Sequence, residues 1–264
     1  MKTSDTFNIN RFGLMVKQSL IHNYRMLIIS LVGFCGGLFM LLLIIQAMNE
    51  FETWTKDAFS ATFITIFIAT GLLYTGNSFP GLRTREKSYS YLLTPASALE
   101  KFLLELISRI VLFIVMIPLL YWVIFNAEGY LLQVLSSRFH FTPHSFAEIP
   151  LIQVPENSSI RYWAAVMPFA LGLLIFTLPF AGTTVFMKYP LPKTLFSVAI
   201  IFFFHLFLVY FFLEILDWAS NGPKDGRILG MDGEGAIKFF TIYAMVANVV
   251  LLVASYYKLK EREA

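Results

Sequence analysis

The sequence predicts an all-α integral membrane protein with six transmembrane helices, forming one transmembrane domain over residues 1–264. Hydrophobic residues make up 57% of the chain and charged residues only 14%. Soluble proteins of this size carry about 25% charged residues, so much of this surface must face lipid. Six apolar stretches and an uneven placement of Lys and Arg supply the second and third observations.

The six apolar stretches each reach the roughly 20 residues that a helix needs to cross a hydrocarbon core of about 30 Å. The first is too long for a signal-peptide core and lacks a small-residue cleavage site, so we expect it to be retained. The second is rich in Thr and Gly, which favour close contact between helices in lipid. We predict spans at residues 26–48, 58–79, 102–125, 162–187, 194–216 and 237–257.

The positive residues predict the orientation of these spans. With the N-terminus inside, 13 Lys and Arg residues fall in cytoplasmic segments and 6 in outside segments. The short loops agree, because "NEFETWTKD" is acidic and "MKYPLPK" is basic. Both chain ends are therefore predicted to be cytoplasmic.

Residues 7–25 precede the first span and have an amphipathic pattern. Their apolar and small residues recur at helical spacing: Phe12, Met15, Val16, Ser19 and Leu20. We predict an interfacial helix on the cytoplasmic side of the membrane. The alternative is a polar stalk that continues the first span.

Two outside loops are longer than the others, at residues 127–161 and 217–236. The first begins "EGYLLQVLSSRFHF", which is apolar enough to lie on the membrane surface as a helix. The second is rich in Gly and Asp, which is typical of turns.

The cytoplasmic loop after the second span contains "LRTREKSYSYLLTPASALEKF". Its basic residues Arg83, Arg85 and Lys87 are expected near lipid headgroups, with Tyr89 and Tyr91 at the interface. The Thr94-Pro95 pair marks a boundary between helices, since proline disfavours helix in the residue before it. Ser97 and Glu100 then form a capping box at the start of a helix. These features alone fit either a docking surface or an ordinary basic loop.

The stretch "YLLTPASALEKFLLEL" resembles the sequence after the second span in permeases of the type-2 ATP-binding-cassette exporter family. The matching pattern is two leucines, a hydroxyl residue, proline, a small residue and serine, followed by Glu100 and Lys101, and it is occupied here by Leu92, Leu93, Thr94, Pro95, Ala96 and Ser97. The likeness is strongest to permeases of Bacteroidetes-type bacteria. The longest outside loop here follows the third span, whereas family members usually have their structured outside element between the last two spans.

This resemblance implies an exporter subunit in the bacterial cytoplasmic membrane that forms half of a translocation pathway. The implied partners are a soluble ATPase, which binds the ATP, and a second identical or different permease subunit. The N-terminal helix and the loop after the second span would contact the ATPase. The coupling residues implied are Arg83, Arg85, Lys87, Tyr89, Tyr91, Leu92, Leu93, Thr94, Pro95 and Ser97.

Sequence motifs for catalysis or nucleotide binding are absent from the chain. There is no G-x-x-x-x-G-K-[ST], H-E-x-x-H or G-x-S-x-G. The single cysteine, Cys35, excludes an intrachain disulfide, and we expect no carboxylate at ligand spacing from His140 and His144, which share a loop. The net charge of +3 is too small to suggest nucleic acid as a partner. We therefore predict no enzyme activity, cofactor or metal on this chain.

Four ionisable residues within or near the predicted spans are candidates for function, because charge in lipid is costly. Glu105 and Arg109 are four residues apart, which favours an ion pair, although they could line an inner vestibule. His205 lies mid-span, where it could bond a neighbouring helix or belong to a substrate or proton path. Glu214 lies near the outer end of the fifth span.

Three other functions compete with the exporter hypothesis. An ATPase-independent carrier favours internal repeats with interrupted spans, and the sequence has no convincing repeat. A non-transport scaffold stays open. A membrane-embedded enzyme would need polar residues that converge at one depth, whereas the sequence offers scattered ones.

Overall fold

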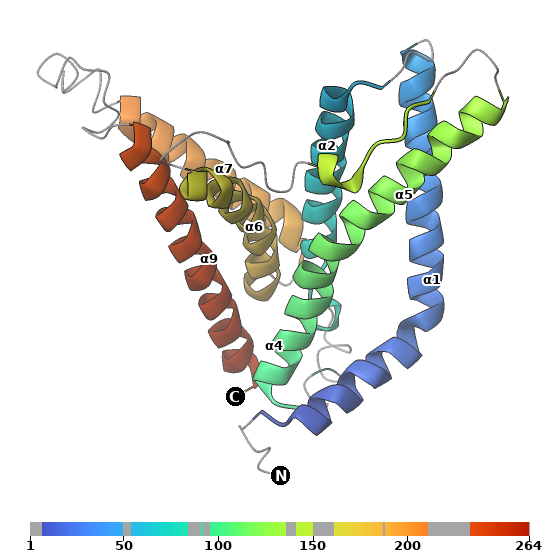
Figure 1. Cartoon of the computed structure of the whole chain (residues 1–264). Helices are drawn as coiled ribbons and strands as arrows, with labels where there is room; N and C mark the ends of the chain where they lie inside the picture. Colours follow the sequence, from blue (N-terminus) through green and yellow to red (C-terminus); the bar gives the residue numbers. More distant parts are fainter. Residues whose placement is uncertain are drawn as a thin grey trace, which may run out of the picture. The chain divides into compact units, whose positions relative to one another are not determined.

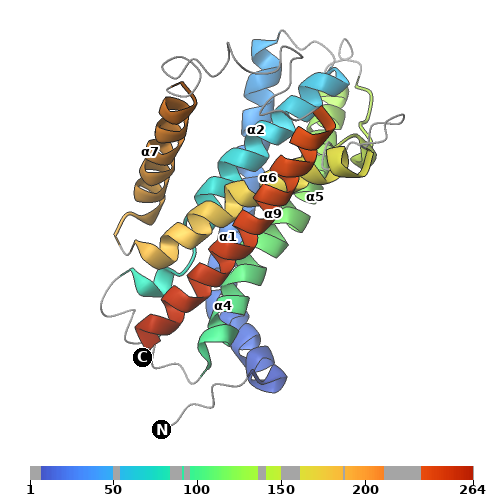
Figure 2. The same cartoon turned by 90° about the vertical axis from the view of Figure 1, so that its left-hand side faces the viewer.

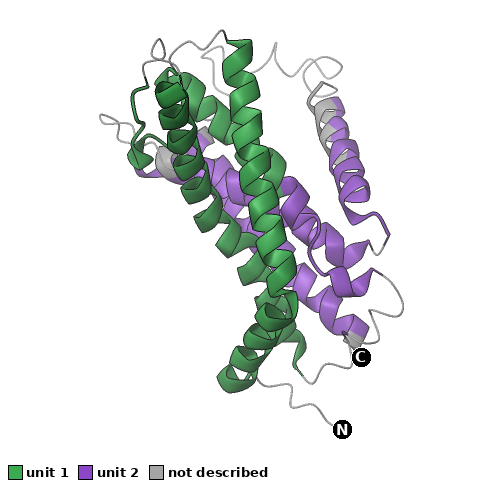
Figure 3. Ribbon diagram, turned by 90° about the vertical axis from the view of Figure 1, so that its right-hand side faces the viewer, with its two compact units in different colours: residues 1–71, 95–150 green, residues 72–94, 151–264 purple. Residues whose placement is uncertain are grey.

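The computed structural model describes residues 7–49, 54–83, 91, 96–135, 141–149, 161–186, 188–210 and 233–263. These residues form helices and connecting turns, with no strand among them (Figure 1). The chain packs as two compact units, coloured separately in Figure 3. Unit 1 comprises residues 1–71 and 95–150, and unit 2 comprises residues 72–94 and 151–264.

Five of the described helices are long and apolar enough to cross a membrane. The prediction of an all-α membrane protein is thereby confirmed. The helix α7 (Pro190–Tyr210) covers the first part of the predicted fifth span, and the described residues stop there. The fifth span, the total of six spans and the orientation of the chain ends stay predictions. The five helices lie at Ile9–Met48, Lys56–Thr75, Ala98–Leu135, Val166–Val185 and Ile237–Arg262.

Unit 1 begins with α1 (Ile9–Met48), a continuous helix of 40 residues. It includes both the predicted N-terminal helix and the predicted first span, and Figure 1 shows its dark-blue beginning set at an angle to the rest. Four of the five residues in the predicted apolar face are half-buried: Phe12, Met15, Val16 and Ser19. This face is thus directed partly at the protein itself.

The third predicted span belongs to a continuous helical rod made of three segments (Figure 1). The segments are α4 (Ala98–Leu106), a π-helical turn η2 (Ile107–Val111) and α5 (Leu112–Leu135). The rod continues ten residues past the expected end at position 125. Residues 128–135 of the outside loop are therefore part of α5 rather than a separate surface helix.

The core of unit 1 is an aromatic seam between α2 (Lys56–Thr75) and α5. Phe59, Phe63 and Phe67 recur every four residues along α2, which places their rings on one face. Phe59 and Phe63 each lie 5.2 Å from the Tyr121 ring, centroid to centroid, and Phe67 lies 5.3 Å from Phe113. The other side of α5 packs against α1, whose buried residues Leu38, Leu42 and Gln46 also recur every four positions.

Unit 2 is centred on α6 (Arg161–Val185) and α9 (Gly233–Glu263), which lie side by side (Figure 2). Small and hydroxyl side chains dominate the buried positions of α9, at Thr241, Ala244, Asn248 and Ser255. Such residues let helix backbones approach closely, which is the usual basis of helix packing in lipid. The guanidinium of Arg262 donates to the carbonyl of Val185 at 3.3 Å, so α6 and α9 end beside each other.

Candidate functional site

The start of α1 is bonded to the start of α4 through one carboxylate. Glu100 Oε1 accepts from the backbone N–H of Asn8 at 2.9 Å and from Nη2 of Arg11 at 2.7 Å. Glu100 Oε2 accepts from Nε of Arg11 at 2.8 Å and from the backbone N–H of Ser97 at 2.9 Å. We call Asn8, Arg11, Ser97 and Glu100 the N-terminal junction.

Helix capping explains why these residues meet. Asn8 is the N-cap of α1 and its side chain accepts from the N–H groups of Asn10 and Arg11. Ser97 is the N-cap of α4, and the predicted capping box with Glu100 is confirmed. Glu100 therefore satisfies the N-cap amide of both helices, which would otherwise lack intrahelical partners.

Two electrostatic effects stabilise the buried carboxylate of Glu100 at the N-terminal junction. A negative charge at a helix N-terminus is stabilised by the aligned peptide dipoles, and Glu100 lies at two such ends. The fork of Arg11 supplies the compensating positive charge and two donors. The Glu100 side chain is fully buried and that of Arg11 is 28% exposed, so the carboxylate depends on these partners.

The predicted coupling loop is described in part. Arg83 follows the short 3₁₀ helix η1 (Pro80–Leu82), and its Nη2 lies 2.8 Å from Oδ1 of Asn77 and 3.4 Å from the carbonyl of Gly76. Arg83 thus binds the C-terminal end of α2, where a positive charge is favoured. The other coupling residues outside the N-terminal junction, apart from Tyr91, lie beyond the described residues: Arg85, Lys87, Tyr89, Leu92, Leu93, Thr94 and Pro95.

The turn between α2 and this loop has a constrained backbone. Phe79 has a left-handed conformation with φ of 50°, which is uncommon for a residue with a side chain. Its ring is buried 5.2 Å from that of Phe180, so packing holds this conformation. The Tyr91 ring lies against the backbone of Gly81, where a Cβ would come within 2.8 Å of its Cδ2 atom. The ends of the loop therefore fold back on the turn.

The expected ion pair in the third span is confirmed. Arg109 Nε lies 3.3 Å from Glu105 Oε2, and the two side chains are 23% and 13% exposed. Arg109 lies within the π-helical turn η2, and such turns frequently occur at functional sites. The backbone of His205 lies in α7, while its side chain and the whole of Glu214 fall outside the described residues.

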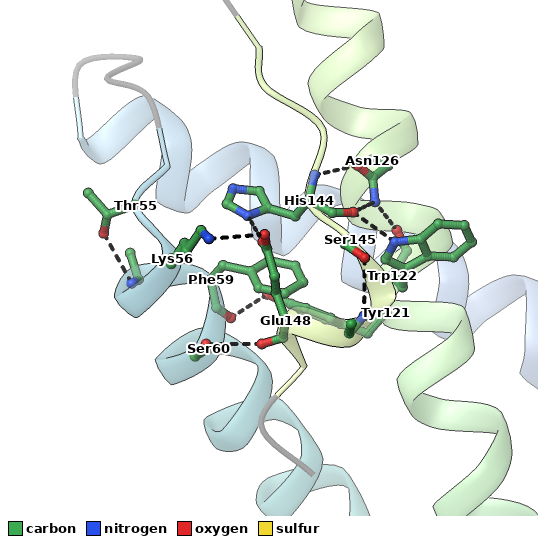
Figure 4. A network of polar contacts seen from close by, with 12 residues as sticks. Thr55, Lys56, Phe59, Ser60, Tyr121, Trp122, Asn126, His144, Ser145 and Glu148 are labelled. Carbon is green, nitrogen blue, oxygen red and sulfur yellow. Dashed lines mark hydrogen bonds and ion pairs between the residues drawn. The ribbon is translucent and has the colours of Figure 1, made fainter. Parts of the chain in front are cut away.

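A second polar network lies in unit 1 at the end opposite the N-terminal junction (Figure 4). His144 Nδ1 lies 2.7 Å from Glu148 Oε2, and Lys56 Nζ lies 3.4 Å from Glu148 Oε1. The His144 ring stacks on Phe59 with 4.7 Å between centroids. These contacts join the segment 141–149 to the start of α2.

The same segment is also fixed to α5. The carbonyl of His144 accepts from the indole of Trp122 at 2.9 Å and from the amide of Asn126 at 3.2 Å (Figure 4). The hydrogen bond from His144 Nδ1, together with Lys56, holds the pKa of the Glu148 carboxyl below its ordinary value. Across the described residues, no group of three His, Cys, Asp or Glu side chains could hold a metal ion. Lys56, His144 and Glu148 therefore form an ionic network, which we call the Glu148 network.

Sequence reasoning did not identify three residues that the structure brings into networks. Arg11 is one of them, because no sequence signal connects it with Glu100, 89 residues away. The expectation that no carboxylate lies at ligand spacing from His144 is wrong, because Glu148 is four residues away and a helical turn brings the two side chains together. Asn248, alone in an apolar stretch, was the clearest overlooked signal.

Asn248 forms the principal polar link within unit 2. Its amide oxygen accepts from the Thr177 hydroxyl at 2.6 Å, and its amide nitrogen donates to the carbonyls of Ala170 and Ala244 at 3.0 and 2.8 Å. The side chain is buried, and these three bonds satisfy an amide that would otherwise lack partners in an apolar environment. It joins α6 to α9 in the middle of both helices.

Comparison of the chain with known protein families, curated proteins and solved structures finds no match.

Proposed function

We propose that this chain is the membrane-spanning permease subunit of an ATP-binding-cassette exporter in a bacterial cytoplasmic membrane. It forms half of a translocation pathway with a second permease subunit, and a separate soluble ATPase drives it. In this proposal the chain has six spans with both ends in the cytoplasm. The exporter-like stretch from Leu92 to Ser97 supports the proposal from sequence.

The observation that carries the proposal is the N-terminal junction. A permease must convert movement of an ATPase into movement of its spans. Here Ser97, at the end of the exporter-like stretch, begins the rod that contains the third predicted span, and Glu100 bonds that helix start to the start of α1. A displacement of the loop is therefore passed to two membrane helices together.

The first test is affinity purification of the tagged full chain from its own membranes in mild detergent. The proposal predicts a stoichiometric soluble ATPase that carries a P-loop. A purified chain without an ATPase, in a detergent that preserves other such complexes, would contradict the proposal. That result would favour a carrier, a scaffold or a membrane-embedded enzyme.

The coupling role of the loop is tested by replacing Leu92 and Leu93 with Asp. We expect the complex to lose substrate-dependent ATP hydrolysis while the permease stays folded, because charge at the leucine pair disrupts an apolar contact. The matched control is Leu135→Asp, at the opposite end of the rod, where Leu135 is 74% exposed. Full coupling in the Leu92→Asp and Leu93→Asp variants would place the docking surface elsewhere.

A further inference from the structure

Glu128 is a completely buried carboxyl group near the end of α5. Its relative exposure is 0%, and neither of its carboxylate oxygens has a hydrogen-bond partner within the part of the chain that the structure describes. No ion pair is formed by Glu128 among the described residues either. A buried acid without partners is rare in folded proteins and indicates a specific state of the group.

The position of Glu128 follows from the periodicity of α5. Tyr121, Phe125 and Glu128 lie at helical spacing on one face, and all three are fully buried. The Phe125 ring lies 5.1 Å from the Trp54 ring and 4.7 Å from that of Phe59. Glu128 thus follows, by one helical turn, the centre of an aromatic cluster.

Phe141 covers the adjacent turn of the helix. A Cβ on Gly129 would collide with its ring, so this ring lies directly on the helix backbone. Phe141 also lies 5.3 Å from Tyr130 and is itself buried. The segment that begins at Phe141 therefore helps to separate this part of α5 from water.

None of the described ionisable groups on the neighbouring elements forms an ion pair with Glu128. At the start of α2, Lys56 pairs with Glu148, and Asp57 is exposed and carries the same charge as an ionised glutamate. In the 141–149 segment, His144 Nδ1 binds Glu148, while its buried Nε2 has no hydrogen-bond partner among the described residues.

Among the described residues, the remaining elements of unit 1 also place no cation in an ion pair with Glu128. Between Arg25 and its end, α1 carries Cys35 as its one titratable side chain. On α5 itself, the Tyr121 hydroxyl donates to the carbonyl of Phe59 at 2.9 Å, and Tyr130 is exposed. No positive charge among the described residues balances Glu128.

An isolated carboxylate in such surroundings is strongly disfavoured, and the usual outcome is that it takes up a proton. We propose that Glu128 is a proton-binding site, at which the side chain holds its proton as a neutral carboxylic acid in neutral solution. The proton comes from water and returns to water when the group ionises. Because Phe141 covers the adjacent turn, displacement of the 141–149 segment would favour that release. This inference does not depend on an ATPase partner.

The test is infrared spectroscopy of the purified full chain at neutral pH. We expect a C=O stretching band of a protonated carboxylic acid that shifts in D₂O and is lost in Glu128→Gln. The matched control is Glu105→Gln, which removes an ion-paired carboxylate and should leave this band unchanged. An identical band region in the wild type and Glu128→Gln would show that Glu128 is ionised, and would overturn the proposal.

The folding of the variants gives an independent answer. Glutamine has nearly the shape of a protonated glutamate and is uncharged, so Glu128→Gln should fold and melt close to the wild type. Failure of Glu128→Gln to fold would mean that the charge is needed, which contradicts the proposal. In Phe141→Ala we expect the acid band to disappear at a lower pH than in the wild type, and an unchanged titration would refute the role of Phe141.

Discussion

The contact between Arg11 and Glu100 is the side-chain pair on which the proposed coupling most depends. We predict that Arg11→Ala lowers the melting temperature of the purified protein by a few degrees, because Glu100 stays buried without its positive partner. Glu100→Gln should also lower it, and the double variant should lose less than the two single losses combined. Differential scanning fluorimetry in detergent measures this.

Lys17→Ala is the matched control for Arg11→Ala, since Lys17 is an exposed cation on the same helix. The melting temperature of Lys17→Ala should equal that of the wild type. Strictly additive losses in Arg11→Ala and Glu100→Gln would mean that the two side chains do not interact in solution.

The stability contributed by the Glu148 network should depend on pH. Its pKa is held below the ordinary value of 4.5 in the folded protein by the hydrogen bond from His144 and by Lys56. A depressed carboxyl pKa stabilises the fold above the ordinary value, and this stabilisation is lost as the pH falls through the lowered pKa. We predict that Glu148→Gln melts below the wild type at pH 7 and that the difference shrinks at acid pH. A constant difference between pH 7 and pH 3 would contradict this linkage.

Asn248 should stabilise unit 2 through its bonds to both helices. We predict that Asn248→Ala lowers the free energy of unfolding by about 1 kcal/mol, the usual size of a polar link between membrane helices. Asn23→Ala is the control, since Asn23 is exposed and bonds the Ser19 carbonyl of its own helix. Equal effects of the two substitutions, measured by chemical denaturation, would exclude a special role for Asn248.

Helix α6 approaches α7 closely at Gly182. A Cβ on Gly182 would lie 2.7 Å from Cβ of Thr194, whereas one on Gly172 of the same helix has open space. We predict that Gly182→Ala costs about 1 to 3 kcal/mol through overpacking, while Gly172→Ala is neutral or slightly stabilising. Chemical denaturation of both variants measures the two changes in the free energy of unfolding. An unchanged free energy in Gly182→Ala would mean that α7 does not pack against α6 at Gly182.

The helices themselves were largely predictable, because length and hydropathy specify a span directly. Their ends were less so. The third predicted span ends at position 125, yet the helix continues through "NAEGYLL". It continues because Glu128 and Gly129 face the protein interior instead of water. The capping box and the Glu105–Arg109 pair were predictable because both depend on local spacing. The N-terminal junction was not, since it joins residues that are distant in sequence.

At the scale of the whole chain, the two units are stabilised by different kinds of side chain. Unit 1 combines an aromatic core with two ionic networks at its opposite ends, and unit 2 relies on small residues, hydroxyls and Asn248. In the permease that we propose, the N-terminal junction is the element that receives force from the ATPase. The central claim is that an ATPase applies this force at the loop that ends at Ser97.

The most direct measurement is photo-crosslinking in living cells, with a photoreactive amino acid placed at Leu93 and, as control, at Leu135. We predict a covalent adduct between the Leu93 variant and a P-loop ATPase, and no such adduct with the Leu135 variant. Absence of an ATPase adduct at Leu93, or the same adduct from both positions, would contradict it.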